Sequence, residues 1–369
     1  MRYQRRVAAV GLIAASALVL GACGSDENAG GGGVTAVEGV QCGGKPDLRS
    51  SGSSAQNNAM TRFVATYQQT CQGQTLNYTP SGSGAGRNEF LGGQTDFAGS
   101  DSALKEGDET NRAQQRCASP AWNLPLVFGP VAIAYNVAGV TDLVLDGPTT
   151  ARIFNGQITT WNDPAIAALN QGKALPAAPI VVNFRSDESG TTENFQKYLV
   201  AASNGAYGKE AAQTFNGGVG AGARGSQGVA DATRNTPNSI TYVEASFAQR
   251  GGIAMAQIIN SGGGAPVALS PESVGAAINN VQVSGQGNDL KLNLDSLYQA
   301  SAPGAYPIAL ATYEIVCSNY AEDQTASAVR AFLSTALSPN AQQALPEAGY
   351  VPLPDQFKQR LTTAVNAIQ

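Results

Sequence analysis

The sequence predicts an α/β protein with two lobes and a ligand cleft between them. Short apolar strands alternate with segments whose apolar residues recur at helical spacing, which is typical of α/β architecture. The chain has 369 residues, enough for two domains that each bury a core. A strand followed by two helices returns near the end of the chain, at 308–368, so we expect the chain to cross between the lobes more than once.

The strands are expected where short apolar runs are bounded by turn residues. They lie near Thr75 and Asp96 and at 124–128, 131–135, 180–184, 240–243 and 308–315. The helices are expected where apolar residues are three or four positions apart. They lie at 60–67, near Asn88, and at 150–154, 164–169, 192–199, 323–337 and 355–368.

The first 22 residues are predicted to be a signal peptide. Three arginines precede an apolar run at 7–20 that is too short to span a membrane as a mature helix. The run ends in Leu20-Gly21-Ala22-Cys23, which resembles a bacterial lipobox and implies a diacylglycerol on Cys23. A plain secretory signal that is cut elsewhere is the alternative. Residues 23–45 then form the lipidated cysteine and a flexible tether, because 24–40 has almost no large side chains.

The composition argues against several classes of function. The formal net charge is −5 and no run of Lys or Arg follows the signal, so nucleic acid is not an expected partner. The chain has no histidine, which excludes Ser-His-Asp and Cys-His catalysis and His-based metal sites. We expect no metal and no cofactor. The stretch 220–225 matches G-x-G-x-x-G, but no hydrophobic strand precedes it, so we interpret it as a loop.

Four cysteines remain besides Cys23. An even number in an exported chain predicts two disulfides, and the sequence leaves all three pairings open. The four are too widely spaced for a zinc site. They are Cys42, Cys71, Cys117 and Cys317.

The stretch from Arg185 to Thr192 is the strongest candidate for a binding site. It follows a predicted strand and precedes a predicted helix, with Ser189 at the expected N-cap. Free amides at a helix start and the positive end of its dipole attract anions, and Gly190 lets the backbone approach a ligand closely. An ordinary capped helix with a surface Arg–Asp pair is the alternative.

Two further stretches share this design. Ser51 to Ala55 precedes a predicted helix that Ser53 or Ser54 can cap, and Ser81 to Gly86 follows a strand and precedes a short helix. A fourth stretch, 96–101, is a strand that ends on the carboxylate of Asp101. Ligands of open α/β sheets bind at the carboxyl ends of strands, so we expect these turns to meet between the lobes.

These motifs resemble those of the phosphate-binding lipoproteins of bacterial phosphate-specific ABC transporters, over essentially the whole mature chain. The matching segments are Gly52-Ser53-Ser54-Ala55, Gly82 to Gly86, Ser100-Asp101, Arg185 to Thr191, Gly225 to Gly228 and Ser239 to Glu244. The resemblance implies a two-lobe, periplasmic-binding-protein-like fold of type II. Residues 46–131 with 311–369 would form lobe I, and 132–310 would form lobe II.

The resemblance also implies the site and the partners. The ligand would be inorganic phosphate, and its binding residues would be Ser53, Ser54, Ala55, Ser83, Asp101, Arg185, Ser189, Gly190 and Thr191, with Asp187 orienting Arg185. The protein would be a lipid-anchored monomer on the extracytoplasmic face of the cytoplasmic membrane. It would serve the permease and ATPase subunits of an importer, with no enzymatic activity.

This sequence departs from the family pattern at three positions. Many relatives have Thr at position 54 and Phe at 55, where this chain has Ser54 and Ala55, and Glu188 stands where glycine is common. The first two keep the main-chain donors. Glu188 adds negative charge near the mouth of the site and would weaken binding if it faced the ligand.

Asp101 gives the expected site its selectivity. A carboxylate repels a bound anion unless the ligand brings a proton, and phosphate at neutral pH keeps at least one whereas sulfate keeps none. A charge-assisted hydrogen bond of this kind contributes about 1.5–3 kcal/mol. The alternatives are a binder of another oxyanion, such as molybdate, sulfate or an organic acid, and a surface hydrolase, although no activated nucleophile or metal cluster is visible in the sequence.

Overall fold

The computed structural model describes residues 39–369. The predicted signal peptide, the lipidation site Cys23 and most of the tether lie outside the described residues. Within 39–369, no helix has both the length and the apolar character needed to cross a membrane.

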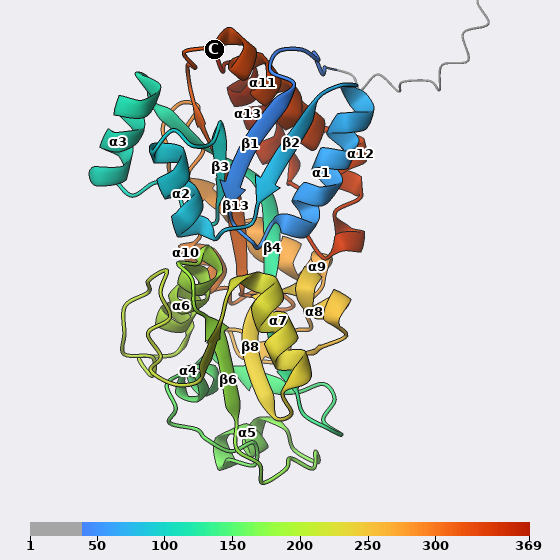
Figure 1. The fold of residues 1–369 in the computed structure, drawn as a ribbon. Helices are drawn as coiled ribbons and strands as arrows, with labels where there is room; N and C mark the ends of the chain where they lie inside the picture. Colours follow the sequence, from blue (N-terminus) through green and yellow to red (C-terminus); the bar gives the residue numbers. More distant parts are fainter. Residues whose placement is uncertain (1–38) are drawn as a thin grey trace, which may run out of the picture. The chain divides into compact units, whose positions relative to one another are not determined.

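Lobe I, the upper part of Figure 1, is built on strands in the order β2-β1-β3-β13-β4. Strand β1 is parallel to β2 and β3, whereas β13 is antiparallel to β3 and β4. The strands are β1 (Asp47–Gly52), β2 (Thr75–Thr79), β3 (Phe97–Ser100), β4 (Ala121–Asn136) and β13 (Ala309–Cys317). The helices are α1 (Asn57–Thr70), α2 (Ser83–Leu91), α3 (Asp108–Cys117), α11 (Asp323–Leu337), α12 (Pro339–Gln343) and α13 (Asp355–Asn366).

The core of lobe I forms where α1 and α11 pack against the sheet. The ring of Phe332 on α11 lies 5.5 Å from that of Tyr67 on α1 and 5.6 Å from that of Phe97 on β3. All three side chains are fully buried. This packing fixes the start of α1 relative to the ends of β1 and β3, which is where the predicted binding turns lie.

Lobe II, the lower part of Figure 1, continues from the second half of β4 through β8, β6 and β7, with β9 also paired to β4. The strands are β6 (Val181–Arg185), β7 (Ala221–Ala223), β8 (Ser239–Glu244) and β9 (Ala254–Met255), and a separate pair is formed by β5 (Val144–Asp146) and β10 (Gln257–Ile259). The helices are α4 (Gly147–Phe154), α5 (Pro164–Leu169), α6 (Gly190–Ala202), α7 (Gly225–Asn235) and α8 (Ala245–Gly251). Stacked rings of Phe195 and Tyr242, with centroids 4.4 Å apart, attach α6 to β8.

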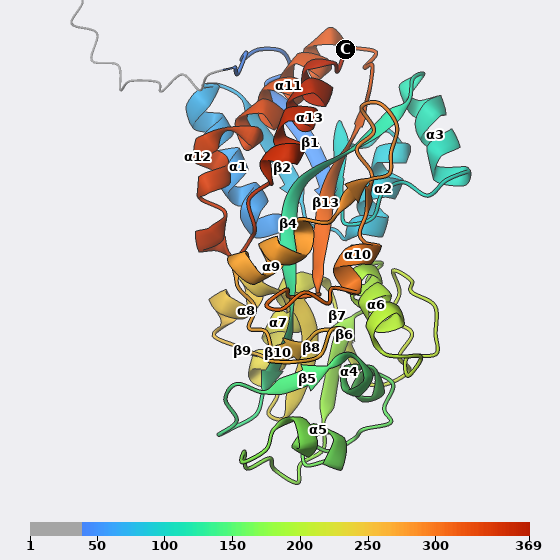
Figure 2. The ribbon, with the colours of Figure 1, turned by 180° about the vertical axis from the view of Figure 1, so that it is seen from behind.

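Strand β4 passes from one lobe into the other, as Figures 1 and 2 show. Residues 121–130 pair with β13, and 131–136 pair with β8. The sequence predicted two separate strands here, but the structure has one strand of 16 residues. Pro130, which cannot donate a backbone hydrogen bond, lies where the strand changes partners.

A small hairpin from the second half of the chain reaches lobe I. It contains β11 (Gln282–Val283) and β12 (Leu292–Asn293), and it lies between α9 (Pro271–Ile278) and α10 (Asp295–Tyr298). Asp289 accepts the backbone amide of Asn123 on β4 at 2.7 Å, and the Leu292 amide donates to the hydroxyl of Tyr313 on β13 at 3.1 Å. The hairpin therefore contacts lobe I strands, although its residues fall within the range 132–310.

The structure resolves the disulfide pairing that the sequence left open. Cys42 is bonded to Cys71, and Cys117 to Cys317. The first bond attaches the segment before β1 to the end of α1. The second closes a sequence separation of 200 residues, from the end of α3 to the end of β13. Long closed loops restrict the unfolded chain most, so this bond is expected to contribute the larger stabilisation.

Several elements were not predicted because their apolar signal is weak. In α3 only Ala113 and Cys117 are buried, and α7 buries no aromatic residue. The interpretation of 220–225 as a loop was wrong, since it contains β7 and the first residue of α7. Strand β7 is a three-residue edge strand made of Ala and Gly, which gives no hydrophobic run to detect.

Candidate functional site

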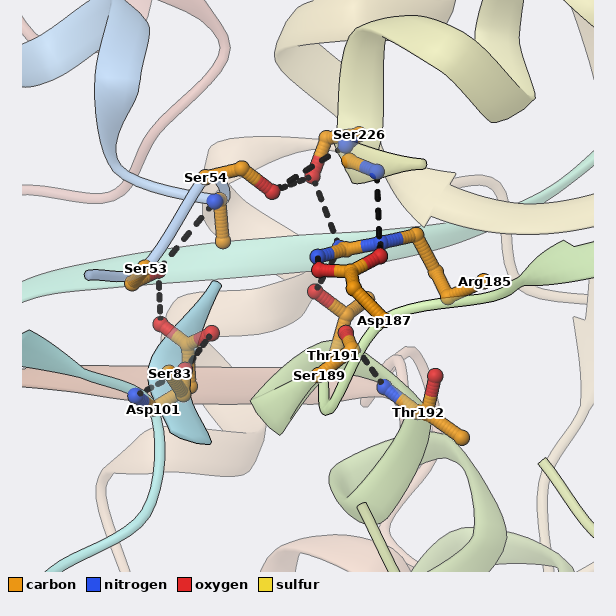
Figure 3. Close-up of polar contacts among 12 residues, drawn as sticks. Ser53, Ser54, Ser83, Asp101, Arg185, Asp187, Ser189, Thr191, Thr192 and Ser226 are labelled. Carbon is orange, nitrogen blue, oxygen red and sulfur yellow. Dashed lines mark hydrogen bonds and ion pairs between the residues drawn. The ribbon is translucent and has the colours of Figure 1, made fainter. Parts of the chain in front are cut away.

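The four predicted turns meet between the two lobes, at the carboxyl ends of β1, β3 and β6 and next to the start of α2. Figure 3 shows the side chains of these turns facing one another. In the described part of the chain, one more element contributes, because the start of α7 lies in the same place.

The first turn does not cap its helix as the sequence predicted. Helix α1 begins at Asn57, its N-cap is Gln56, and no side chain caps it. The expectation that Ser53 or Ser54 caps this helix was therefore wrong. The reason is that both hydroxyls are used in contacts with residues far away in the sequence.

Those contacts place the first turn in the site. Ser53 donates its hydroxyl to Oδ1 of Asp101 at 2.6 Å, and Oγ of Ser53 accepts the backbone amide of Ala55 at 3.1 Å. Ser54 lies 2.9 Å from the hydroxyl of Ser226, at the start of α7. The turn thus connects the carboxylate of lobe I to a serine of lobe II.

The second turn places Ser83 against the same carboxylate. Helix α2 begins at Ser83 with Gly82 as its N-cap and no side-chain cap. Ser83 donates its hydroxyl to Oδ2 of Asp101 at 3.1 Å and accepts the backbone amide of Asp101 at 3.1 Å. Gly82 has a φ of 104°, a conformation that favours glycine.

Asp101 follows β3 directly and is only 4% exposed. Besides the two serines, Thr312 of β13 donates its hydroxyl to Oδ1 at 2.7 Å. Burial raises the pKa of Asp101 to about 6, and the charge of Glu244 also raises it, whereas the three hydroxyl donors lower it. At neutral pH this buried carboxylate is therefore ionised and can accept a further hydrogen bond.

Arg185, the last residue of β6, supplies a guanidinium that is 2% exposed. Its Nε donates to Oδ1 of Asp187 at 2.7 Å, and its Nη2 pairs with Oδ2 of the same carboxylate. Burial alone would raise the pKa of Asp187, but the hydrogen bonds and charge of Arg185 outweigh burial, so the pKa is lowered. Nη1 faces the turn, with Thr191 at 3.3 Å and Ser226 at 3.2 Å.

The start of α6 has the cap that the sequence predicted. Ser189 is the N-cap, and its hydroxyl accepts the amide of Thr192 at 3.2 Å. A Cβ atom at Gly190 would lie 2.5 Å from Cβ of Asp101 and 2.7 Å from Oγ of Ser83. Only glycine fits at this position with the two lobes this close together.

Glu188 lies against the start of α2. A Cβ atom at Gly84 would lie 2.3 Å from Oε2 of Glu188, and the carbonyl of Glu188 accepts the amide of Gly84 at 3.1 Å. Its side chain is exposed. The added negative charge therefore lies at the edge of the site, across the gap between the lobes.

Three residues near the turns were not among the predicted site residues. The first is Ser226, whose hydroxyl contacts Ser54 and Arg185. The second is Thr312, whose hydroxyl contacts Asp101. The third is Glu244, which accepts the hydroxyl of Thr191 at 2.5 Å. The sequence held a signal for two of them, because Ser226 and Glu244 each lie within a segment that matches the family. Thr312 lies within a predicted apolar strand, and nothing local distinguishes it.

A further buried acid, Glu314, lies near Asp101. Glu314 of β13 is fully buried, and neither of its carboxylate oxygens has a hydrogen-bond partner within residues 39–369. Burial raises the pKa of Glu314 to about 8; the nearby amide of Gln56 lowers it and the charge of Asp101 raises it. Glu314 is therefore largely uncharged at neutral pH, which limits the negative charge next to Asp101.

Comparisons with known proteins identify the family of this chain. The model of a PBP superfamily domain matches residues 26–340. Phosphate-binding protein PstS 3 of Mycobacterium tuberculosis (strain ATCC 25618 / H37Rv) is 58% identical over 371 residues, and PstS 2 of the same strain is 55% identical over 370, with 100% of each chain covered.

A solved structure shares the fold. It is a high-affinity periplasmic phosphate-binding protein (PfluDING) bound with phosphate, with a TM-score of 0.69 and 25% identity over 86% of this chain and 93% of that chain. The expected two-lobe periplasmic-binding fold is thereby confirmed. The chain belongs to the PstS phosphate-binding protein family, within the PBP superfamily.

Proposed function

We propose that this chain binds inorganic phosphate and delivers it to the permease and ATPase subunits of an ABC importer, without catalysing a reaction. The arrangement of Asp101 opposite Arg185 carries the proposal. A buried carboxylate that already accepts three hydroxyls can accept a ligand hydrogen, and the guanidinium supplies the only positive charge among the site residues. Such a pair suits an oxyanion that keeps a proton.

The ligand would be surrounded from both lobes. Ser53, Ser54, Ala55 and Ser83 would contribute from lobe I with Asp101. Arg185, Ser189, Gly190 and Thr191 would contribute from lobe II, with Asp187 orienting the guanidinium. Contacts between the lobes beside the site support closure around the ligand: Asn194 donates to the Asp101 carbonyl at 2.9 Å, and Ser102 donates to Glu193 at 2.6 Å.

We also propose a lobe boundary at residue 131. The change of partners of β4 after Pro130 supports it, since the first half of that strand pairs with β13 and the second half with β8 within one sheet. The hairpin at 282–293 lies within the lobe II range but would move with lobe I, because it is hydrogen-bonded to β4 and β13.

Titration calorimetry of metal-free protein tests the proposed ligand. We expect inorganic phosphate to bind at one site per chain, arsenate to compete because it keeps a proton, and sulfate to compete weakly. Equal competition by sulfate or molybdate would favour a general oxyanion binder. Turnover of a chromogenic phosphate ester by metal-replete protein would favour a hydrolase instead.

We further propose that the protein is a monomer held at the extracytoplasmic face of the membrane by a lipid on Cys23. The residues Leu20 to Cys23 support the anchor. Metabolic labelling with a fatty acid is expected to mark the wild-type protein and to leave Cys23→Ala unmarked. Equal label in the Cys23→Ala protein would reject the anchor.

A further inference from the structure

Glu244 is a buried acid next to Thr191, and it has no role among the residues proposed to bind phosphate. It is the last residue of β8, and its side chain is fully buried. Its Oε1 accepts the hydroxyl of Thr191 at 2.5 Å, and its Oε2 has no hydrogen-bond partner within residues 39–369. A buried carboxylate oxygen without a donor is costly, so its presence calls for an explanation.

The hydroxyl of Thr191 can serve only one acceptor. It carries one proton, which it donates to Glu244, while Arg185 Nη1 donates to the same oxygen at 3.3 Å. In this arrangement Thr191 cannot donate to a bound phosphate. To do so it must turn its proton away from Glu244, which would leave both carboxyl oxygens of this fully buried side chain without a donor.

The charges around Glu244 make that state unfavourable. The titratable groups that interact with Glu244 through charge are Asp101 after β3, Arg185 at the end of β6 and Tyr350 from the C-terminal segment. Arg185 is already paired with Asp187. A phosphate anion would therefore add charge to a site with two acids and no unpaired cation among these groups.

We infer that phosphate binding is coupled to the uptake of one proton by Glu244, an inference that rests on the proposed function. The proton comes from solution. Glu244 becomes a neutral acid and donates to the oxygen of Thr191, which then donates its own proton to the phosphate. The relay keeps Thr191 as a ligand donor and removes one negative charge from the pocket as the anion enters.

Calorimetry in buffers of different ionisation enthalpy counts the protons taken up. At pH 8 we expect the wild-type protein to take up close to one proton per phosphate bound. Glu244→Gln should take up almost none, because glutamine mimics the neutral acid and its amide can donate to Thr191.

Glu314→Gln is the matched control, because it also removes a buried acid near Asp101 but has no contact with Thr191. Measured at pH 7, where Glu314 is already largely uncharged, it should keep the proton uptake that wild type shows at the same pH. Phosphate binding by wild type with no proton uptake at pH 8 would overturn the inference while leaving the proposed function intact. Uptake that persists in Glu244→Gln would overturn it as well, because the proton would then go to another group. Absence of phosphate binding by wild type would instead reject the proposed function.

Discussion

Replacing Arg185 with alanine is expected to abolish high-affinity phosphate binding. The guanidinium is the only cation among the site residues, and it is buried and hydrogen-bonded twice to Asp187. In the complex the guanidinium would pair with the phosphate anion. Truncating one partner of a buried charge pair between protein and ligand costs about 2–5 kcal/mol, roughly 30-fold to several-thousand-fold in affinity. Titration calorimetry of the purified variant measures the loss.

The variant should also be less stable, because Asp187, whose side chain is only 11% exposed, is left without its partner. Breaking a buried pair from one side typically costs about 3–5 kcal/mol. The double variant Arg185→Ala/Asp187→Ala is the control, since it removes the uncompensated charge as well. We expect it to regain much of the stability in thermal unfolding but none of the affinity. Phosphate binding of wild-type strength in the double variant would show that Arg185 does not hold the ligand.

Replacing Asp101 with asparagine is expected to change the selectivity more than the affinity for phosphate. The variant loses a charge-assisted bond to the ligand proton, worth about 1.5–3 kcal/mol. Sulfate gains more, because the unpaired carboxylate that opposed it in a buried site is gone. Calorimetric titration with both anions gives the ratio of affinities. A phosphate-over-sulfate preference equal to that of wild type would contradict this role for Asp101.

Thermal unfolding without ligand controls for the fold of the Asp101→Asn protein. The pKa of Asp101 in the folded protein, about 6, lies above the ordinary value of 3.8. The ionised side chain therefore costs stability above pH 6, and this cost is relieved as the pH falls from about 6 toward 4. We expect the variant to be at least as stable as wild type at pH 8, and this advantage to shrink at pH 5.

The sequence predicted the parts of the site that are determined locally. The turn after β6 could be located because a strand, a capping serine and a glycine follow one another within a few residues, and Ser189 caps α6 as expected. Ser53 and Ser54 were given the wrong local role, because neither side chain caps α1. Their hydroxyls contact Asp101 and Ser226, which are 48 and 172 residues away, and no local pattern reports such contacts.

The remaining parts needed the tertiary structure. Strand β7 and helix α7 have few large apolar residues, so the position of Ser226 beside Arg185 could not be derived from spacing. Glu244 ends an apolar strand, where an acid is usually solvated, and its burial depends on tertiary contacts that include β4 and Thr191 of α6. The disulfide pairing likewise depends on tertiary contacts, because each bond joins a helix end to a distant segment: the stretch before β1 in one case and the end of β13 in the other.

We propose that the buried carboxylate of Asp101 selects an oxyanion that carries a proton. A high-resolution crystal structure of the phosphate complex tests it most directly. We predict one oxygen of Asp101 at about 2.5–2.7 Å from a phosphate oxygen, the distance of a charge-assisted O–H···O⁻ bond, with Arg185 on the opposite side of the ligand. A bound phosphate held only by donors, with Asp101 beyond hydrogen-bonding distance, would contradict the claim.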